Sequence, residues 1–366
     1  MFLIETEKGK KYCSLCNTNG KKWLFDYEAI NIGLCLYQPS SKKGRLIKKF
    51  IQNSWGGLFF RFFSKSHTYL IDENFQKIVN ELFGCSDVQY SFFEGTPGIH
   101  CKIVGQVSSG HDILGYFKLT NSKSIYSLFE KEYDLVTYLH SVGMNNVPNP
   151  ICVKKIEDEY VYFQTTKKSI DSIVPNDYNT LINNFLCELY DKTFENIKYE
   201  HSAIYRNIHD LEFGKRRCVF KEKYMYYLSL FDEQLSNKTV EMCIAHRDFT
   251  PWNMFIENEN LFVFDWEYAS KEYLPMMDMF HFEIQRKIMD EGLGIQELIK
   301  YIDTNWGGYM SCVSRVTLLE TQWIFVAYLL DFIALYVSRA NNLSDEEFKS
   351  VELRFNLLQH IEKKYM

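Results

Sequence analysis

Residues 244–268 read Ile-Ala-His-Arg-Asp-Phe-Thr-Pro-Trp-Asn-Met-Phe-Ile-Glu-Asn-Glu-Asn-Leu-Phe-Val-Phe-Asp-Trp-Glu-Tyr. Three oxygen-bearing side chains stand out in this stretch, Asp248, Asn253 and Asp265. Two short apolar runs flank a polar turn, which predicts a β-hairpin. In a hairpin centred on Glu259, positions 253 and 265 face each other across the open end. Amide and carboxylate oxygens that converge beside Asp248 predict a magnesium site. An ordinary hairpin with turn-capping ends has the same pattern.

The composition describes a globular protein without a nucleic-acid role. The 366 residues are 46% hydrophobic and 24% charged, enough for one two-lobed unit or for two to three domains. A net charge of -6 argues against general nucleic-acid binding, which needs clustered cations. The ten cysteines include one C-x-x-C pair but no second pair at zinc-ligand spacing, so we expect free thiols in a reducing compartment.

Two segments bear on localisation. The first residues contain acids and no apolar run long enough for a signal peptide. The most hydrophobic run, Trp323–Val337, is shorter than a membrane span and contains Asp331, so we expect a buried core helix. Together these features predict a cytoplasmic protein.

Residues 1–85 read as an N-terminal extension. Lys22–Leu36 suggests two successive strands. The stretch 42–65 then joins lysines and arginines to an aromatic cluster from Trp55 to Phe63. Two interpretations fit this stretch. It could dock on an anionic membrane surface, at the inner face of the membrane, and hold a lipid-linked acceptor. Alternatively, it is a lysine-faced helix whose rings pack on the neighbouring lobe.

Residues 86–166 predict a β-rich lobe with one helix. Alternating apolar runs predict strands at Val88–Phe93, Ile99–Val107, Ile113–Leu119, Pro150–Lys154 and Glu159–Gln164. The turn at Gly95 and Gly98 could lie over phosphates, or be only a turn. A helix follows from about Asn121 to His140, with its apolar residues on one stripe.

Two charged residues interrupt this apolar pattern. Lys118 stands near the end of a predicted strand, and Glu132 falls on the apolar stripe of the helix. A carboxylate on a buried helical face needs a cationic partner, because burying it alone would cost several kcal/mol. We therefore expect Lys118 and Glu132 to form an ion pair, whether its role is structural or functional.

Residues 167–366 predict a mainly helical lobe behind a hinge at about 165–168. The helical periodicity falls on Tyr178–Ile197, Lys221–Leu235, Met276–Met289, Ile295–Thr304, Val313–Val337 and Asp345–Lys364. The opening hairpin lies within this lobe.

Taken in order, these residues resemble the kinase-like fold. Lys118 and Glu132 look like the strand lysine and its helix partner. His246-Arg247-Asp248 through Asn253 matches the catalytic pattern H-R-D-x-x-x-x-N, and Asp265-Trp266-Glu267 stands where D-F-G would be. The resemblance covers residues 88–340. It implies an α+β, bilobal protein-kinase-like fold with a β-rich N-lobe, a helical C-lobe and the N-terminal extension.

Departures from protein kinases point to one branch. Only a short loop separates Asp265 from Asp278, there is no Ala-Pro-Glu, and Thr250 replaces the usual lysine of Ser/Thr kinases. The sequence is more similar to the aminoglycoside-phosphotransferase and choline-kinase-like family, in particular to bacterial members found with glycan-assembly enzymes. That family usually has Gly where Arg247 stands. Arg247 could therefore contact an anionic acceptor or form a structural ion pair.

The resemblance implies a role for each residue. Asp248 would deprotonate the acceptor hydroxyl, and Asn253 with Asp265 would hold Mg²⁺. Lys118, fixed by Glu132, would hold the phosphates of ATP. The hinge strand to Gln164 would frame adenine by main-chain bonds, and Asp278 would brace the catalytic loop. The acceptor would be a small molecule or sugar, including a cell-surface glycan or glycolipid intermediate. A protein kinase and an inactive pseudokinase scaffold are the alternatives.

Overall fold

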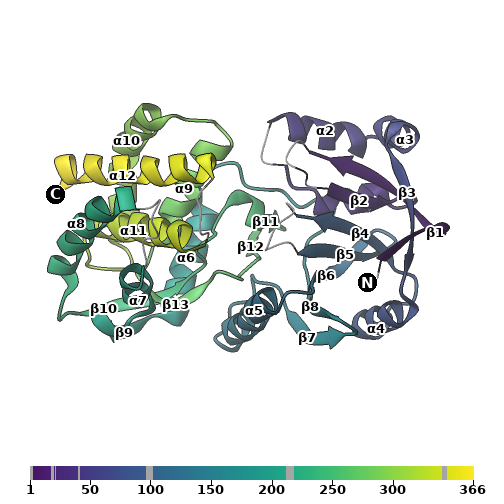
Figure 1. Ribbon diagram of the computed structural model, residues 1–366, viewed down its shortest axis with the longest axis horizontal. Coiled ribbons are helices and arrows are strands. Elements are labelled where there is room, and N and C mark those ends of the chain that lie inside the picture. Colours follow the sequence, from purple (N-terminus) through teal and green to yellow (C-terminus); the bar gives the residue numbers. More distant parts are fainter. Residues whose placement is uncertain are drawn as a thin grey trace. The chain divides into compact units, whose positions relative to one another are not determined.

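The computed structural model describes residues 3–17, 20, 22–39, 42–95, 102–211, 218–339 and 344–366 (Figure 1). Helices and strands are both abundant, so the expected α+β class is confirmed. The chain divides into two compact units. Unit 1 comprises residues 1–175 and 252–267, and unit 2 comprises residues 176–251 and 268–366.

Unit 1 is built on an eight-stranded antiparallel sheet with the order β3-β1-β2-β4-β5-β6-β8-β7. Its strands are β1 (Leu3–Cys16), β2 (Lys22–Asp26), β3 (Ser66–Ile71), β4 (Gln89–Glu94), β5 (Ile103–Ser109), β6 (Asp112–Thr120), β7 (Pro150–Ile156) and β8 (Glu159–Thr165). Its helices are α1 (Ile30–Gly33), the 3₁₀ turn η1 (Leu34–Leu36), α2 (Lys42–Gln52), α3 (Ser54–Phe63), α4 (Glu73–Phe83) and α5 (Lys123–Ser141). The strands of residues 3–85 thus extend the same sheet that carries Lys118.

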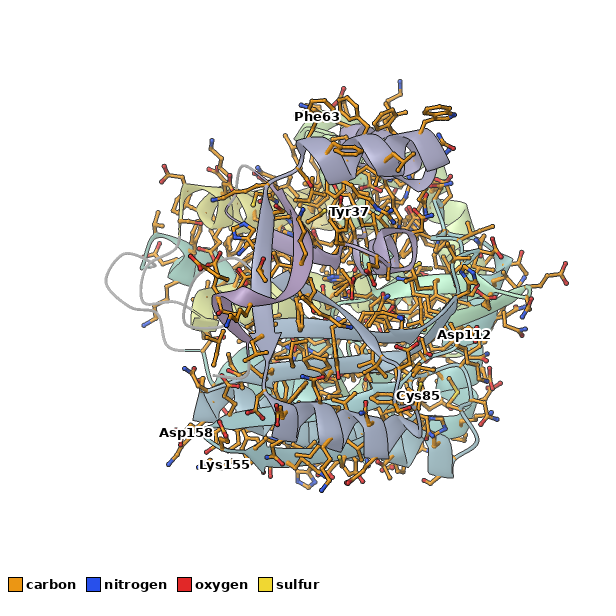
Figure 2. All side chains as sticks on the ribbon, turned by 90° about the vertical axis from the view of Figure 1, so that its right-hand side faces the viewer. Tyr37, Phe63, Cys85, Asp112, Lys155 and Asp158 are labelled. Atoms are coloured by element: carbon orange, nitrogen blue, oxygen red, sulfur yellow. The ribbon has the colours of Figure 1, made fainter. Side chains whose placement is uncertain are left out.

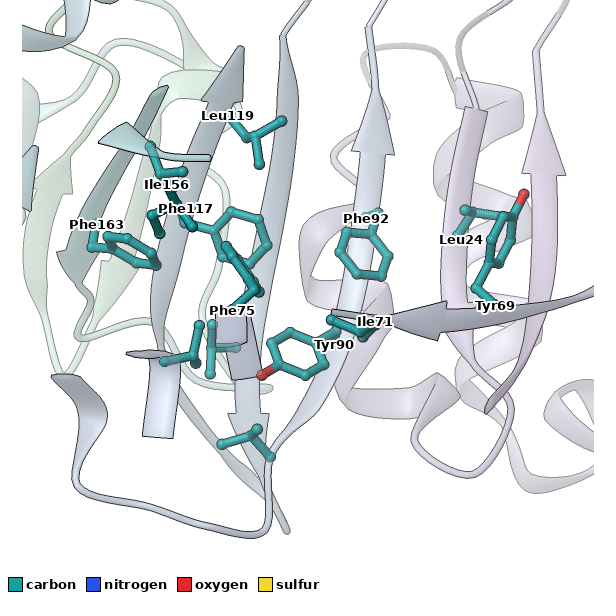
Figure 3. Packing of buried hydrophobic residues seen from close by; sticks show 14 of the residues in the cluster. Leu24, Tyr69, Ile71, Phe75, Tyr90, Phe92, Phe117, Leu119, Ile156 and Phe163 are labelled. Carbon is teal, nitrogen blue, oxygen red and sulfur yellow. The ribbon is translucent and has the colours of Figure 1, made fainter. Parts of the chain in front are cut away.

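The main core of unit 1 lies on one face of this sheet. Phe75 of α4 packs there against Phe117 of β6, with ring centroids 5.1 Å apart, and Phe163 of β8 joins them (Figure 3). Successive strand residues point to opposite faces. Phe117 therefore enters the core, while Lys118 lies on the other face, where Phe129 of α5 packs near Tyr162.

Residues 30–36 correct one prediction. The alternating apolar residues predicted a strand, but the structure has α1 and η1 there. The side chain of Asp26 accepts a hydrogen bond from the Glu28 amide at 3.0 Å, which turns the chain out of the sheet. The apolar residues Ile30 and Leu34 are buried by helical spacing instead.

Unit 2 is mainly helical. Its helices are α6 (Thr180–Thr193), the 3₁₀ turn η2 (Tyr199–His201), α7 (Ala203–His209), α8 (Cys218–Leu235), α9 (Met277–Met289), α10 (Ile295–Val313), α11 (Thr321–Arg339) and α12 (Asp345–Tyr365). A three-stranded sheet joins β9 (Glu195–Lys198), β10 (Thr239–Ala245) and β13 (Ser270–Tyr273), in the order β13-β10-β9. The helix predicted to run to Ile197 ends at Thr193, because Phe194 is extended and residues 195–198 pair with β10. The helix predicted to begin at Val313 begins at Thr321.

Helix α11 confirms the predicted core helix. Within the described residues, its window Thr321–Ser338 is the one helical segment long and apolar enough to cross a membrane, and 78% of that window is buried in the structure. Ile324, Leu329 and Ile333 are fully buried. The burial of this helix within unit 2 accounts for its hydrophobicity.

Candidate active site

The predicted ion pair of unit 1 is present. Lys118 Nζ donates to Glu132 Oε2 at 2.6 Å, which confirms the pairing expected from the sequence. Glu132 is fully buried and Lys118 almost so. The second oxygen of Glu132 accepts from the Trp266 amide at 3.2 Å. Glu132 therefore fixes both the strand lysine and the segment that carries Asp265.

Asp265 and Glu267 meet this pair from the other side. Lys118 Nζ donates to Asp265 Oδ1 and lies 3.9 Å from Glu267 Oε2. Lys102, just before β5, contacts Glu267 and lies 3.5 Å from Asp265 Oδ1. Two lysines and three carboxylates thus form one cluster in unit 1, which we call the Lys118 cluster.

Lys102 and Glu267 were missed by the sequence reasoning. Val104 pairs with Lys118 across β5 and β6, so alternation places residue 102 on the sheet face of Lys118. That signal becomes visible only once the register is known. The turn at Gly95 and Gly98, predicted between strands, falls mostly on residues 96–101, outside the described residues.

The hairpin between β11 (Met254–Glu257) and β12 (Asn260–Val263) differs by one residue from the predicted register. Glu257 pairs with Asn260, so the turn has two central residues, Asn258 and Glu259, both at positive φ. This is the geometry of a type I′ turn, whose twist matches the strands. The Phe264 amide consequently bonds to the carbonyl of Asn253 at 2.9 Å, and Asp265 follows one residue later.

Burial and charge set the protonation of the Lys118 cluster. Burial raises the pKa of Glu132 to about 7, although the Lys118 ammonium opposes this. Burial lowers the pKa of Lys118, but the carboxylates of Asp265 and Glu132 outweigh it and hold the pKa well above its usual value. The pKa of Lys102 is likewise raised, because Asp265 outweighs burial and the repulsion from Lys118. Both lysines are therefore charged at neutral pH.

The donor set of this cluster fits a hard divalent cation. Oxygens of Glu132, Asp265 and Glu267 lie within 4.8 Å of one another. Both oxygens of Glu132 are bonded, one by Lys118 and one by the Trp266 amide, and its side chain is fully buried, whereas the Asp265 side chain is 26% exposed. Asp265, with Glu267 next to it, is therefore the more accessible ligand. Asn253 is buried directly before strand β11 of the same hairpin. Oxygen-only donors suit Mg²⁺.

Gln164 of β8 lies on the sheet face of Lys118, since it pairs with Tyr116, two residues before Lys118. Strand β8 is interior, so its main-chain groups pair with β6 and β7. The Gln164 side chain is buried, and its Oε1 has no hydrogen-bond partner within the described residues. An orphan buried acceptor costs roughly 1–3 kcal/mol, which favours a ligand donor at this position.

Residues 246–251 of the catalytic loop belong to unit 2, whereas Asn253 belongs to unit 1. Asp278, in the first turn of α9, accepts hydrogen bonds from the amides of His246 at 2.6 Å and Arg247 at 2.9 Å. This confirms the predicted brace. Burial raises the pKa of Asp278, while His246 and the two amides oppose that rise. His281, one turn further along α9, places Nε2 3.5 Å from Asp248 Oδ1 and was not singled out from the sequence. The Asp248 side chain is 38% exposed.

Arg247 is held by Asp331 of α11. Its Nε lies 3.0 Å from Oδ2 and its terminal nitrogen 2.8 Å from Oδ1, a bidentate pair. Tyr273 also donates to Asp331, at 3.2 Å. Of the two roles weighed for Arg247, the structure therefore has the ion pair. Arg247 adopts a φ of 65°, a left-handed conformation that an L-residue adopts at a cost of about 1 kcal/mol.

Comparisons with known proteins bear on the fold of this chain. No protein-family model matches the chain, and no curated protein matches it. Among solved structures, the amicoumacin kinase hAmiN in complex with AMP-PNP, Ca²⁺ and Ami has a TM-score of 0.53 at 14% identity, covering 80% of this chain and 94% of that one. The chain therefore shares the kinase-like fold of this structure.

Two further structures accompany it. Aminoglycoside phosphotransferase APH(4)-Ia, in ternary complex with ADP and hygromycin B, gives 0.49 at 10% identity over 80% of this chain and 99% of that one. A fructosamine-3-kinase from Haemophilus somnus gives 0.48 at 10% identity over 78% and 96%.

Proposed function

We propose that this protein is an ATP-dependent, Mg²⁺-dependent kinase that phosphorylates a hydroxyl group of a small molecule. The observation that carries the proposal is the Lys118 cluster, in which a buried lysine is held between Glu132 and Asp265. With every group ionised, its two ammonium and three carboxylate groups leave one negative charge. A divalent cation and the phosphates of a nucleotide would rebalance that charge.

Each residue has a proposed role. Lys118, fixed by Glu132, binds the nucleotide phosphates, and the orphan oxygen of Gln164 accepts from the adenine amino group. Asp265, Glu267 and Asn253 hold Mg²⁺, which would neutralise the charge developing on the phosphates. Asp248 orients the acceptor hydroxyl and takes its proton.

The acceptor is proposed to be a small molecule, with carbohydrates, including glycan or glycolipid intermediates, as the first class to test. The support is chemical: a carboxylate base beside a histidine, Asp248 and His281, suits an alcohol acceptor. A protein kinase is the weaker candidate, because the short run from Asp265 to Asp278 leaves no room for an activation segment.

The experiment is transfer of radiolabelled phosphate from ATP to a panel of sugars, aminoglycosides, choline-like amines and glycolipid extracts. We expect one class to be labelled in the presence of Mg²⁺. Asp248→Asn should reduce labelling by about a thousandfold while leaving ATP affinity unchanged. Unchanged transfer by that variant would remove Asp248 as the base. ATP binding without any transfer, to acceptor or water, would favour the pseudokinase.

A further inference from the structure

Helix α3 presents its apolar face outward. Its large apolar residues recur at 55, 58, 59, 62 and 63, the spacing of a single helical face. In a globular protein that face normally enters the core. Here Trp55 is 86% exposed and Phe62 77% exposed, whereas Phe60, on the opposite side, packs into the core of unit 1. Of the two interpretations of this stretch, packing of the rings on a neighbouring lobe is therefore wrong for most of them.

Three of the exposed rings contact one another. Phe59 stacks on Phe63, with centroids 4.2 Å apart, and meets Phe50 of α2 at 6.1 Å. Figure 2 shows Phe63 on the outer side of this helix pair. A Cβ at Gly56 would lie 1.8 Å from the carbonyl oxygen of Phe50, so glycine is what lets α3 approach α2 so closely. The close approach fixes the outward orientation of the rings.

The stretch of sequence that carries these rings is cationic. Residues 29–71 contain seven lysines and arginines and no acidic residue, in a chain whose net charge is -6. Lys43 and Lys49 are exposed on α2, and Lys65 is exposed just after α3. Exposed lysines thus lie on α2 and directly after α3, the two helices that carry the exposed rings. We call Lys43, Lys49, Phe50, Trp55, Phe59 and Phe62 the α2–α3 surface.

We propose that the α2–α3 surface docks on a lipid bilayer that contains anionic lipids. Exposed Trp and Phe insert at the boundary between headgroups and acyl chains, while flanking lysines bind the anionic headgroups. The exposed lysines of the α2–α3 surface favour an anionic bilayer over a dimer formed through this surface. In such a dimer the lysines of the two copies would repel each other. The inference rests on exposure and charge and does not depend on the phosphoryl-transfer reaction.

The test is co-sedimentation of the full-length protein with vesicles of phosphatidylcholine alone or of equal parts phosphatidylcholine and phosphatidylglycerol. We expect binding to the mixed vesicles only, with a blue shift of tryptophan emission. Trp55→Ser with Phe62→Ser should weaken binding about a hundredfold. Lys43→Glu with Lys49→Glu should weaken it by more than about tenfold. These side chains are exposed, so both variants should melt like the unaltered protein.

The matched control is Lys221→Glu with Lys223→Glu, two exposed lysines of α8 that give the same change in net charge. This control should bind the mixed vesicles as well as the unaltered protein does. No binding to mixed vesicles, or equal losses in the control, would overturn the proposal. Self-association that Trp55→Ser with Phe62→Ser abolishes, without vesicle binding, would also overturn it and assign the surface to a dimer.

Discussion

Lys102 is the residue whose role the sequence did not reveal. Lys118, Glu132 and Asp265 could be predicted, because a charge within an apolar pattern demands a partner. Lys102 and Glu267 could not, since their approach depends on strand register and on the loop after β12. The hairpin register, which differs by one residue from the prediction and so changes the positions of Asn253 and Asp265, could not be predicted for a similar reason. The turn places Glu259 at a positive φ that glutamate rarely adopts.

Lys102→Met should change two affinities in opposite directions. Removal of the ammonium leaves Asp265 and Glu267 less neutralised, so Mg²⁺ alone should bind about tenfold more tightly. ATP should bind about tenfold more weakly, because one phosphate-binding cation is lost. Calorimetric titration of each ligand measures both. Lys131→Met, exposed on α5, is the control and should change neither. Equal weakening of both affinities would mean that Lys102 only stabilises the fold.

Among the elements, the catalytic loop is anchored by side chains from distant segments. Arg247 of the loop, Asn207 of α7 and Tyr273 of β13 all bond to Asp331 of α11. The long helices and the main strands were predicted from periodicity. The short strands β9 and β13 were missed, because four residues show too little alternation and their pairing comes from β10.

The Arg247 and Asp331 pair should show strong coupling in unfolding measurements. Asp331→Asn leaves a buried guanidinium without its anion and should cost about 3–5 kcal/mol. Arg247→Gly leaves the Asp331 carboxylate without its cation. Because glycine adopts the positive φ at position 247 without strain, this variant should lose less stability than Asp331→Asn. The double variant should be less destabilised than the sum of the single variants, by at least about 1 kcal/mol. Urea denaturation of the four proteins gives this cycle, and additive losses would show that the pair contributes little.

At the scale of the whole molecule, a buried lysine links pH to folding. Lys168 lies in the segment after β8, and its Nζ donates to the carbonyl of Cys35 at 2.7 Å. Burial, with repulsion from Lys48, lowers the pKa of Lys168 to about 7. In the unfolded chain the same group titrates near 10.4. Between these values the unfolded state binds more protons, so stability rises with pH.

Lys168→Met should therefore be most stabilising, relative to the unaltered protein, at about pH 6. At that pH the lysine is charged in both the folded and the unfolded chain. The advantage should shrink by up to about 1.4 kcal/mol per pH unit between pH 7 and 10. Urea denaturation across this range measures the difference. Lys131→Met should show no such slope. A difference for Lys168→Met that stays constant with pH would contradict the lowered pKa.

The central claim is that the Lys118 cluster binds Mg²⁺ and the phosphates of ATP. Calorimetric titration of ATP into the full-length protein, with and without Mg²⁺, tests it most directly. We predict Mg²⁺-dependent binding that Asp265→Asn and Lys118→Met each weaken by about a hundredfold, while Lys131→Met leaves it unchanged. Binding that is absent in the unaltered protein, or that survives both substitutions intact, would contradict the claim.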